Sequence, residues 1–436
     1  MHTRTRWAAA LAAITLVAVA AAWSTSSRGG EAQELPQPSA GALLTDGLIQ
    51  PKNMKIGPDG LLYIAESGSG GDTIVNVPGV GETGVGSTGR VSSIDPDTGA
   101  RTTLLDALPS SLGPVEDAVG PADVAFIGDQ LYYLQTHGGE EWGFPDTPTG
   151  IYEINNGVAT LVADIGAFNA ANPTQAITDG TQPDVEPGGN PYSMIVRDGV
   201  FYVVDGNHNR LIRATVDGDV SEVVEFPGHP VSTGIAQGET GPFTIAYLGP
   251  GPFLPEAGKV VTVGAGGGAI TEIASGASML TDVEFGPGGQ LYALQFNDTV
   301  EAGEQVFAPG TGKIMTVNGD GTLSPLVVGL TFTTGMYFDG DTAFVVNDGL
   351  NATGTGQVWR IDNFSSVTPP PAPTPAPATA TAVAPVATPT SSGIVAPDTG
   401  TGPADGGMAA GAWLLVALLA GAALTTGGLA LARARR

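Results

Sequence analysis

Short apolar runs separated by tight turns of Gly, Asp and Pro recur six times between about residues 43 and 363. In the clearest copy, an apolar run at 54–56 is followed by a Gly-Pro-Asp-Gly turn and a second run at 62–65, and another copy repeats this arrangement at 283–294. Short runs rich in Val, Ile, Leu, Phe and Tyr and bounded by such turns are typical of β-strands. No stretch of this region shows helical periodicity, so the pattern predicts an all-β body.

Each copy contains expected strands in groups of four, within a period of about 50 residues, which is typical of β-propeller blades. The sixth copy ends at Ile361 without a fourth strand, whereas a surplus strand precedes the first copy at 42–48. This shortage and surplus indicate that the N-terminal strand completes the last blade and so removes an exposed edge. The sequence therefore predicts a six-bladed β-propeller, closed by an N-terminal strand, over residues 42–363.

Both ends of the chain are expected to be targeting segments. Residues 1–22 have a basic start, an apolar run and small residues at the end, as in a secretory signal peptide, and a spacer follows at 23–41. An uncleaved anchor is the alternative for this first segment.

Residues 408–432 carry no charge and precede a basic tail at 433–436, which predicts a C-terminal transmembrane helix and a cytoplasmic tail. The body would then be exported to the extracellular face of the cell membrane.

A stalk is expected between the body and this helix. Residues 364–407 are rich in Pro, Thr and Ala, a composition that forms no packed core and favours a disordered, extended chain. Within it, Ala-Pro-Asp-Thr-Gly at 396–400 resembles a sortase-type sorting signal, with Ala396 where that signal has Leu. Cell-wall attachment is therefore an alternative to a permanently inserted helix.

The net charge and the cysteine content limit the classes of partner and the chemistry that we expect for this protein. The formal net charge is −27, with 43 acidic residues against 16 Lys and Arg. This balance argues against nucleic acid, whose phosphates attract basic surfaces. The chain has no cysteine, so neither disulfides nor thiol chemistry are available to it. We expect an extracellular small-molecule or protein ligand, and a membrane contact through the C-terminal helix.

Polar residues occur at two equivalent positions of the six copies, and both positions are expected at one mouth of the central channel. In a four-stranded blade, the loop before the first strand and the loop after the second strand lie on the same face. The residues at the end of the second strand are Glu66, Gln135, Asp205, Tyr247, Gln295 and Asn347. Those near the start of the first strand are Asn53, Asp123, Ser193, Thr233, Asp282 and Thr334.

Four of these residues are carboxylates, namely Glu66, Asp123, Asp205 and Asp282. One interpretation is a hydrated channel mouth without a ligand. The other is a cation site, because convergent carboxylates and amide oxygens suit Ca²⁺, and a bound cation relieves their mutual repulsion. In the second interpretation Glu66 and Asp205 are the metal ligands. Apart from Ca²⁺, no cofactor is expected.

Three histidines, His137, His208 and His229, are expected in mouth-side loops of the second to fourth blades, where they would join the binding residues. Three imidazoles could hold Zn²⁺ or another transition metal. Exposed loop histidines without a metal are the plainer interpretation, since no close spacing in the sequence brings the three together.

The Gly-Pro-Asp-Gly-x-Leu-Tyr copy, Asn-Pro-Tyr at 190–192, Val-Val-Asp at 203–205 and Pro-Glu-Ala-Gly-Lys-Val at 255–260 resemble the ScyD/ScyE family. Its members are exported proteins first noted in scytonemin-pigment gene clusters and related to NHL-type six-bladed propellers. The resemblance covers about residues 43–361. It implies a propeller and, as one functional expectation, an extracytoplasmic step of pigment metabolism, but the family has no established catalytic residues to transfer.

We predict a cell-surface-anchored propeller that binds a small ligand or a protein partner at the mouth of its channel. The alternative is a Ca²⁺-dependent hydrolase that resembles lactonases of the gluconolactonase type. In that alternative the metal polarises a carbonyl group and Asp123 or Asp282 acts as the base. The sequence leaves the choice between binding and catalysis open, although no Gly-x-Ser-x-Gly nucleophile motif is present.

Overall fold

The computed structural model describes residues 35–371, except 114–116, 183–184, 239, 252, 299, 302–303, 306 and 351–353. These residues belong to one compact unit. The predicted signal peptide, membrane helix and basic tail, and most of the predicted stalk, lie outside the described residues. Within the described ranges, no helix is both long and apolar enough to cross a membrane.

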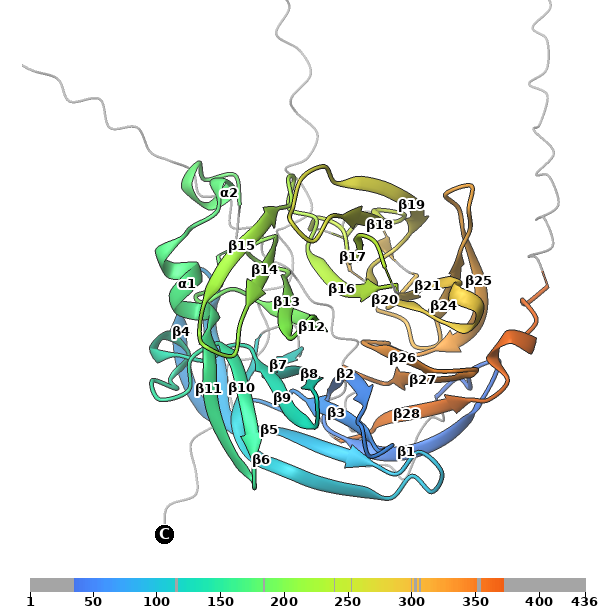
Figure 1. Cartoon of the computed structure of the whole chain (residues 1–436), viewed down its shortest axis with the longest axis horizontal. Coiled ribbons are helices and arrows are strands. Elements are labelled where there is room, and N and C mark those ends of the chain that lie inside the picture. The colour runs from blue at the N-terminus through green and yellow to red at the C-terminus, as the bar shows by residue number, and fades with distance from the viewer. Residues whose placement is uncertain are drawn as a thin grey trace, which may run out of the picture. The chain divides into compact units, whose positions relative to one another are not determined.

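Six antiparallel sheets are arranged around a common centre (Figure 1). The first sheet contains β2 (Pro51–Ile56), β3 (Leu62–Glu66), β5 (Gly81–Ile94) and β6 (Arg101–Leu112). The second contains β8 (Pro121–Ile127), β9 (Gln130–Gln135), β10 (Gly150–Asn155) and β11 (Val158–Asp164). The third contains β12 (Pro191–Arg197), β13 (Val200–Asp205), β14 (Arg210–Ala214) and β15 (Val220–Glu225).

The remaining three sheets repeat this arrangement. The fourth contains β16 (Ser232–Gln237), β17 (Phe243–Tyr247), β18 (Gly258–Val263) and β19 (Thr271–Ala277). The fifth contains β20 (Leu280–Phe285), β21 (Leu291–Gln295), β24 (Gly312–Val317) and β25 (Leu323–Leu330). The sixth contains β26 (Met336–Asp339), β27 (Thr342–Asn347), β28 (Gly356–Ile361) and β1 (Ala42–Leu48). The predicted six-bladed propeller is therefore confirmed for the described part of the chain, and we refer to these sheets as blades 1 to 6.

Several short elements are added to the blades. Two extra strands extend blade 1, β4 (Thr73–Val77) and β7 (Ala118–Val119), and a small separate hairpin is formed by β22 (Val300–Glu301) and β23 (Glu304–Gln305). Three 3₁₀ turns are η1 (Glu140–Trp142), η2 (Pro287–Gly289) and η3 (Phe364–Ser366). Two helices, α1 (Ile165–Ala171) and α2 (Gln175–Thr178), lie between blades 2 and 3. The sequence did not reveal these helices, because segments of seven and four residues are too short for a helical period to show.

Apolar clusters fill the spaces between neighbouring blades. Between blades 2 and 3, for example, Leu134 and Ile151 pack with Met194 and Val203, and all four are fully buried. The first strand of each blade contacts the first strand of the next, and β26 of blade 6 returns to β2 of blade 1. The blades thus form a closed ring around a central channel.

Blade 6 closes as the sequence predicts. Strand β1 pairs with β28 in antiparallel register, from Ala42 opposite Arg360 to Leu48 opposite Gly356. The side chain of Leu48 is fully buried in a cluster that includes Met54 of blade 1. The closing strand therefore contributes both backbone hydrogen bonds and core packing.

The propeller core includes residues beyond 363, because Phe364 belongs to an apolar cluster against which Val367 also packs. Phe364 is buried, and its ring lies 5.1 Å from that of Tyr292 and 4.9 Å from that of Phe338. The composition change at this position in the sequence therefore does not coincide with the end of the packed core.

Candidate functional site

The six polar residues predicted at the end of the second strand lie there in every blade, and all six are buried. Four of them accept a hydrogen bond from a backbone N–H shortly before the first strand of the same blade. The N–H groups of Ile49, Asn190, Ser278 and Thr331 donate to Glu66 (2.8 Å), Asp205 (2.9 Å), Gln295 (3.3 Å) and Asn347 (2.6 Å) respectively. These four polar side chains therefore fix the path of the chain into blades 1, 3, 5 and 6, which is a structural role.

Two members of this set make different contacts. The amide of Gln135 donates to the carbonyl groups of Pro109 (3.1 Å) and Thr136 (2.7 Å), and the ring of Tyr247 packs edge-on against Phe226 at 5.5 Å. Glu66 has further partners beyond the backbone, because Arg90 (2.6 Å) and Ser92 (2.8 Å) both donate to its carboxylate. Glu66 is thus part of a buried ion pair.

The residues predicted near the start of the first strand join neighbouring blades. Side-chain groups of Asn53, Thr233 and Thr334 donate to the carbonyls of Ala122, Leu280 and Pro51 in the following blade, at 3.2, 2.8 and 2.7 Å. The carboxylates of Asp123 and Asp282 accept from the N–H groups of Met194 and Met336, each at 2.8 Å, and Ser193 donates to Asp123 at 3.1 Å. We call this circle of contacts the inter-blade ring. It occupies side-chain polar atoms of all six residues predicted near the start of the first strand.

The four carboxylates therefore have separate partners. The described residues contain no group of three or more His, Asp or Glu side chains placed to share a metal ion. Metal ligation by Glu66 and Asp205, and a base role for Asp123 or Asp282, find no support in this geometry.

A charged cluster, unrecognised in the sequence, lies on the first strands beside the inter-blade ring. Lys55 of β2 forms an ion pair with Glu284 of β20, with 3.1 Å between Nζ and Oε1, and Nζ lies 5.5 Å from the centre of the Tyr337 ring. The side chains of Lys55 and Glu284 are only 17% and 15% exposed. We call Lys55, Glu284, Asp123 and Asp282 the channel cluster.

Electrostatics hold the channel cluster together. Burial alone would lower the pKa of Lys55, but the attraction of Glu284, Asp123 and Asp282 outweighs it and raises that pKa. Burial raises the pKa of Asp123 to about 6, although Lys55 and the hydrogen bonds to Asp123 oppose the shift. Burial, and then repulsion from Glu284, raise the pKa of Asp282 well above its ordinary value. The ammonium group of Lys55 thus interacts with all three carboxylates of the channel cluster, and burial limits the access of water to these groups.

Asp123 should make the protein lose stability as the pH rises from about 4 to about 7. Its pKa in the folded protein, about 6, lies above the ordinary value of 3.8, so the folded state holds the proton more tightly than the unfolded chain. The resulting stabilisation is complete below the ordinary value and is lost as the pH rises through 6. Urea unfolding at several pH values should therefore show wild type losing on the order of 2–3 kcal/mol relative to Asp123→Asn across this range. Parallel curves for the two proteins would contradict the assignment.

The three histidines lie in mouth-side loops, as expected, but make separate contacts. His137 follows β9, and its ring stacks on Trp142 at 3.5 Å. Its Nδ1 and Nε2 lie 2.7 Å from Ser111 Oγ and 3.0 Å from Glu186 Oε2. His208 follows β13, and His229 lies between β15 and β16. The described residues thus give no support to a shared transition-metal site.

The contacts of His137 place a serine, a histidine and a glutamate in one chain of hydrogen bonds. The order resembles a hydrolase triad, and sequence spacing alone did not reveal it. However, Ser111 is only 1% exposed and its hydroxyl also donates to the carbonyl of Val119 at 3.3 Å. A substrate has no access to this hydroxyl, so the chain of contacts joins β6 of blade 1, the loop after β9 and the segment before β12.

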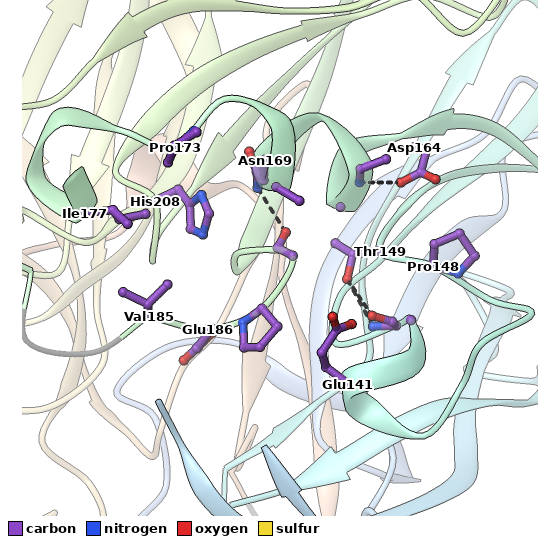
Figure 2. Close-up of a pocket in the computed structure, with 17 residues that line it drawn as sticks. Glu141, Pro148, Thr149, Asp164, Asn169, Pro173, Ile177, Val185, Glu186 and His208 are labelled. Atoms are coloured by element: carbon purple, nitrogen blue, oxygen red, sulfur yellow. Dashed lines mark hydrogen bonds between the residues drawn. The ribbon is translucent and has the colours of Figure 1, made fainter. Parts of the chain in front are cut away.

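A pocket of about 390 Å³ lies on the mouth side between blades 2 and 3 (Figure 2). Its walls are the loop after β9, helix α1, the segment before β12 and His208 of the loop after β13. The connection between blades 2 and 3 spans 165–190, whereas the connection between blades 4 and 5 spans only 278–279. The insertion that carries α1 and α2 therefore forms a wall that a short connection does not provide.

Asp205 supports this pocket from below. Its Oδ2 accepts from Asn169 Nδ2 at 2.7 Å, and its Oδ1 accepts from the N–H groups of Asn190 and His208, both at 2.9 Å. Gly189 has a φ of 78°, and a Cβ there would lie only 2.2 Å from Asp205 Oδ2. A side chain at 189 would therefore displace the carboxylate. Asp205, predicted as a metal ligand, thus contacts the side chain of Asn169 and the backbone of His208.

Two buried polar atoms of the pocket walls have no hydrogen-bond partner. They are Oδ1 of Asn169, a residue 1% exposed, and Nε2 of His208, a residue 4% exposed. Unpaired polar atoms in buried positions are uncommon in folded proteins, and a bound water molecule or ligand is a usual partner for them. This pocket is therefore the candidate site of the molecule.

No protein-family model matches this chain, and no curated protein matches it. Among solved structures it is similar to the PQQ-bound aldose sugar dehydrogenase of Streptomyces coelicolor, with 12% identity, coverage of 76% of this chain and 99% of that one, and a TM-score of 0.46. A gluconolactonase of Xanthomonas campestris has 12% identity, coverage of 77% and 98%, and a TM-score of 0.46. Virginiamycin B lyase of Staphylococcus aureus has 15% identity, coverage of 74% and 98%, and a TM-score of 0.41. Likenesses at this level assign no activity.

The class of this protein therefore rests on its own architecture, which is that of a six-bladed β-propeller. The resemblance of its sequence to the ScyD/ScyE family stays a prediction. Function has to be argued from the pocket, because one fold supports many activities.

Proposed function

We propose that the protein is a binding propeller that holds a small ligand in the pocket between blades 2 and 3. The observation that carries this proposal is the pair of buried, unpartnered polar atoms on Asn169 and His208 in the wall of a cavity of about 390 Å³. A cavity of that size lies within the range of small-molecule sites. A ligand that bonds both atoms would remove the cost of leaving them unpaired.

The channel mouth is a weaker place for the ligand. The side chains of the inter-blade ring already bond to groups of the next blade, and Lys55 pairs with Glu284 between the first strands of blades 1 and 5. At this mouth, buried polar atoms without a partner are found on Gln135 and Tyr247, which belong to different blades. A ligand there would have to break contacts that hold the blades in position.

Export and anchoring at the cell surface are part of the same proposal. The support is the sequence of the two ends, namely the predicted signal peptide at 1–22 and the predicted membrane helix at 408–432. On this basis the pocket would sample small molecules outside the cell.

A bulky side chain on α1 should block the pocket. Ala170 is exposed and lines the cavity, so Ala170→Trp is expected to weaken binding by on the order of tenfold or more without disturbing the core. The measurement is a thermal-shift screen of a broad small-molecule library with the full chain, followed by calorimetry of the hits.

The matched control is Ala171→Trp. Ala171 lies in the same helix and is exposed, but it does not line the cavity. Hits should bind wild type and Ala171→Trp alike. A library without hits, or hits that bind Ala170→Trp as tightly as wild type, would refute the proposed function.

A further inference from the structure

The hydrogen-bonding character of Asn169 in the pocket is fixed by its neighbours. Its side-chain Nδ2 donates to the carbonyl of Gly188 at 2.9 Å and to the Asp205 carboxylate at 2.7 Å. Both of these partners are acceptors, so the NH₂ group must face them and the amide cannot be flipped. Asn169 Oδ1 is therefore a hydrogen-bond acceptor without a donor.

The character of His208 follows from Arg210. Its Nδ1 lies 3.4 Å from Nη2 of Arg210, a residue that is fully buried. A guanidinium group only donates hydrogen bonds, so Nδ1 acts as the acceptor and the neutral ring carries its proton on Nε2. His208 Nε2 is therefore a hydrogen-bond donor without an acceptor.

The rest of the lining excludes anions. Glu141, Asp164 and Glu186 contribute carboxylates, and neither Lys nor Arg is among the described residues that line the cavity. Prolines and aliphatic side chains, such as Pro148, Pro173 and Ile177, supply the apolar part of the walls (Figure 2). An anionic ligand would meet three like charges without a basic partner.

From these contacts we infer that the pocket takes a neutral polyhydroxylated molecule about the size of one sugar ring. This inference rests on the proposed function and adds a ligand class to it. A hydroxyl group both donates and accepts, so hydroxyl groups of one small molecule satisfy Asn169 Oδ1 and His208 Nε2 together. Further hydroxyls donate to the carboxylates at the rim. An ammonium group satisfies only Asn169, and an apolar molecule satisfies neither atom.

The class is tested by calorimetry of the full chain with three probes: glucose, myo-inositol and glucuronate. At least one of the neutral probes, glucose or myo-inositol, should bind. Glucuronate, which adds a negative charge to the same ring, should bind at least tenfold more weakly than glucose. Equal or tighter binding of glucuronate would overturn the inference.

Two substitutions of His208 distinguish the effect of its N–H donor from the effect of its ring size. His208→Gln keeps an N–H donor near the position of Nε2, whereas His208→Phe keeps a ring and removes the donor. Phenylalanine also lacks an acceptor for Arg210, whereas the carbonyl oxygen of glutamine can accept a hydrogen bond, so the unfolding temperatures of both variants are compared with that of wild type as well. Affinity for the neutral probe should fall about tenfold or more in His208→Phe and be largely retained in His208→Gln. Equal loss in both variants would overturn the role of Nε2.

The ligand class can fail while the proposed function stands. If none of the neutral probes binds, but a molecule of another class binds and is blocked by Ala170→Trp, the class is wrong and the pocket remains a binding site. If Ala170→Trp weakens no ligand at all, the proposed function fails and the ligand class fails with it.

Discussion

Replacing Lys55 by methionine is expected to lower the free energy of unfolding by about 3–5 kcal/mol. The substitution keeps a long apolar side chain but removes the cation that faces Glu284, Asp123 and Asp282. These carboxylates are buried, and their pKa values are already raised, so their ionised forms are costly. Without Lys55 they must either repel one another or take up protons. Urea unfolding near neutral pH measures the loss.

The loss should depend on pH and on burial. Because protonation relieves the carboxylates, the effect of Lys55→Met should be smaller at pH 5 than at pH 8. The control is Lys259→Met, which removes an ion pair with Glu272 whose two side chains are 46% and 45% exposed. Exposed pairs contribute roughly 0–1 kcal/mol, so this variant should remain close to wild type. Similar losses in the two variants would show that the channel cluster does not depend on its cation.

The second large effect is expected at the closing strand. Leu48→Ala should cost roughly 2–5 kcal/mol, because Leu48 is fully buried between blades 6 and 1, and its removal leaves a cavity. Leu43 is the matched control, since it lies in the same strand but is 45% exposed. Leu43→Ala should change stability by less than about 1 kcal/mol. Thermal and urea unfolding of both variants test this, and equal effects would mean that β1 is held by its backbone hydrogen bonds alone.

The sequence predicted the blades because short apolar runs recur between turns that contain glycine or aspartate. It also predicted the closing strand, because the sixth copy lacked a strand that the N-terminus could supply. The blades could be predicted from local patterns that occur six times, whereas the closing strand required a comparison of the two ends of the repeat region. The positions of the polar residues at the ends of the second strands followed from the same alignment.

Their roles did not follow, because partners are set by contacts between blades. Nothing near Asp123 in the sequence indicates that Met194 donates to it, 71 positions away. The ion pair of Lys55 and Glu284 spans 229 positions. A signal for this pair was nevertheless present, since the two residues occupy equivalent positions of the two clearest copies and carry opposite charges. Comparing charges within one column of the repeat would have identified them.

The pocket could not be predicted from the repeat at all. Its wall comes from an insertion, 165–190, that departs from the repeat, and its two unpaired atoms are recognised only once Asn169 and His208 have neighbours. The prediction of His208 as a binding residue came from its loop position alone. Its contact with Arg210, which determines the role of its ring, depends on how that loop folds back onto β14.

The antiparallel register of β1 and β28 has a mechanical consequence. Ala42, where β1 begins, lies opposite Arg360, close to the end of β28, so the chain enters and leaves this pair of strands at the same end. A force that pulls the chain before β1 away from the chain after β28 would break the hydrogen bonds between the two strands one at a time. Strands pulled apart in this direction resist little force. A force applied only through the chain that follows β28 would not pull β1 and β28 apart in this way. Attachment of the protein through that segment alone would therefore leave the ring closed when the propeller is pulled.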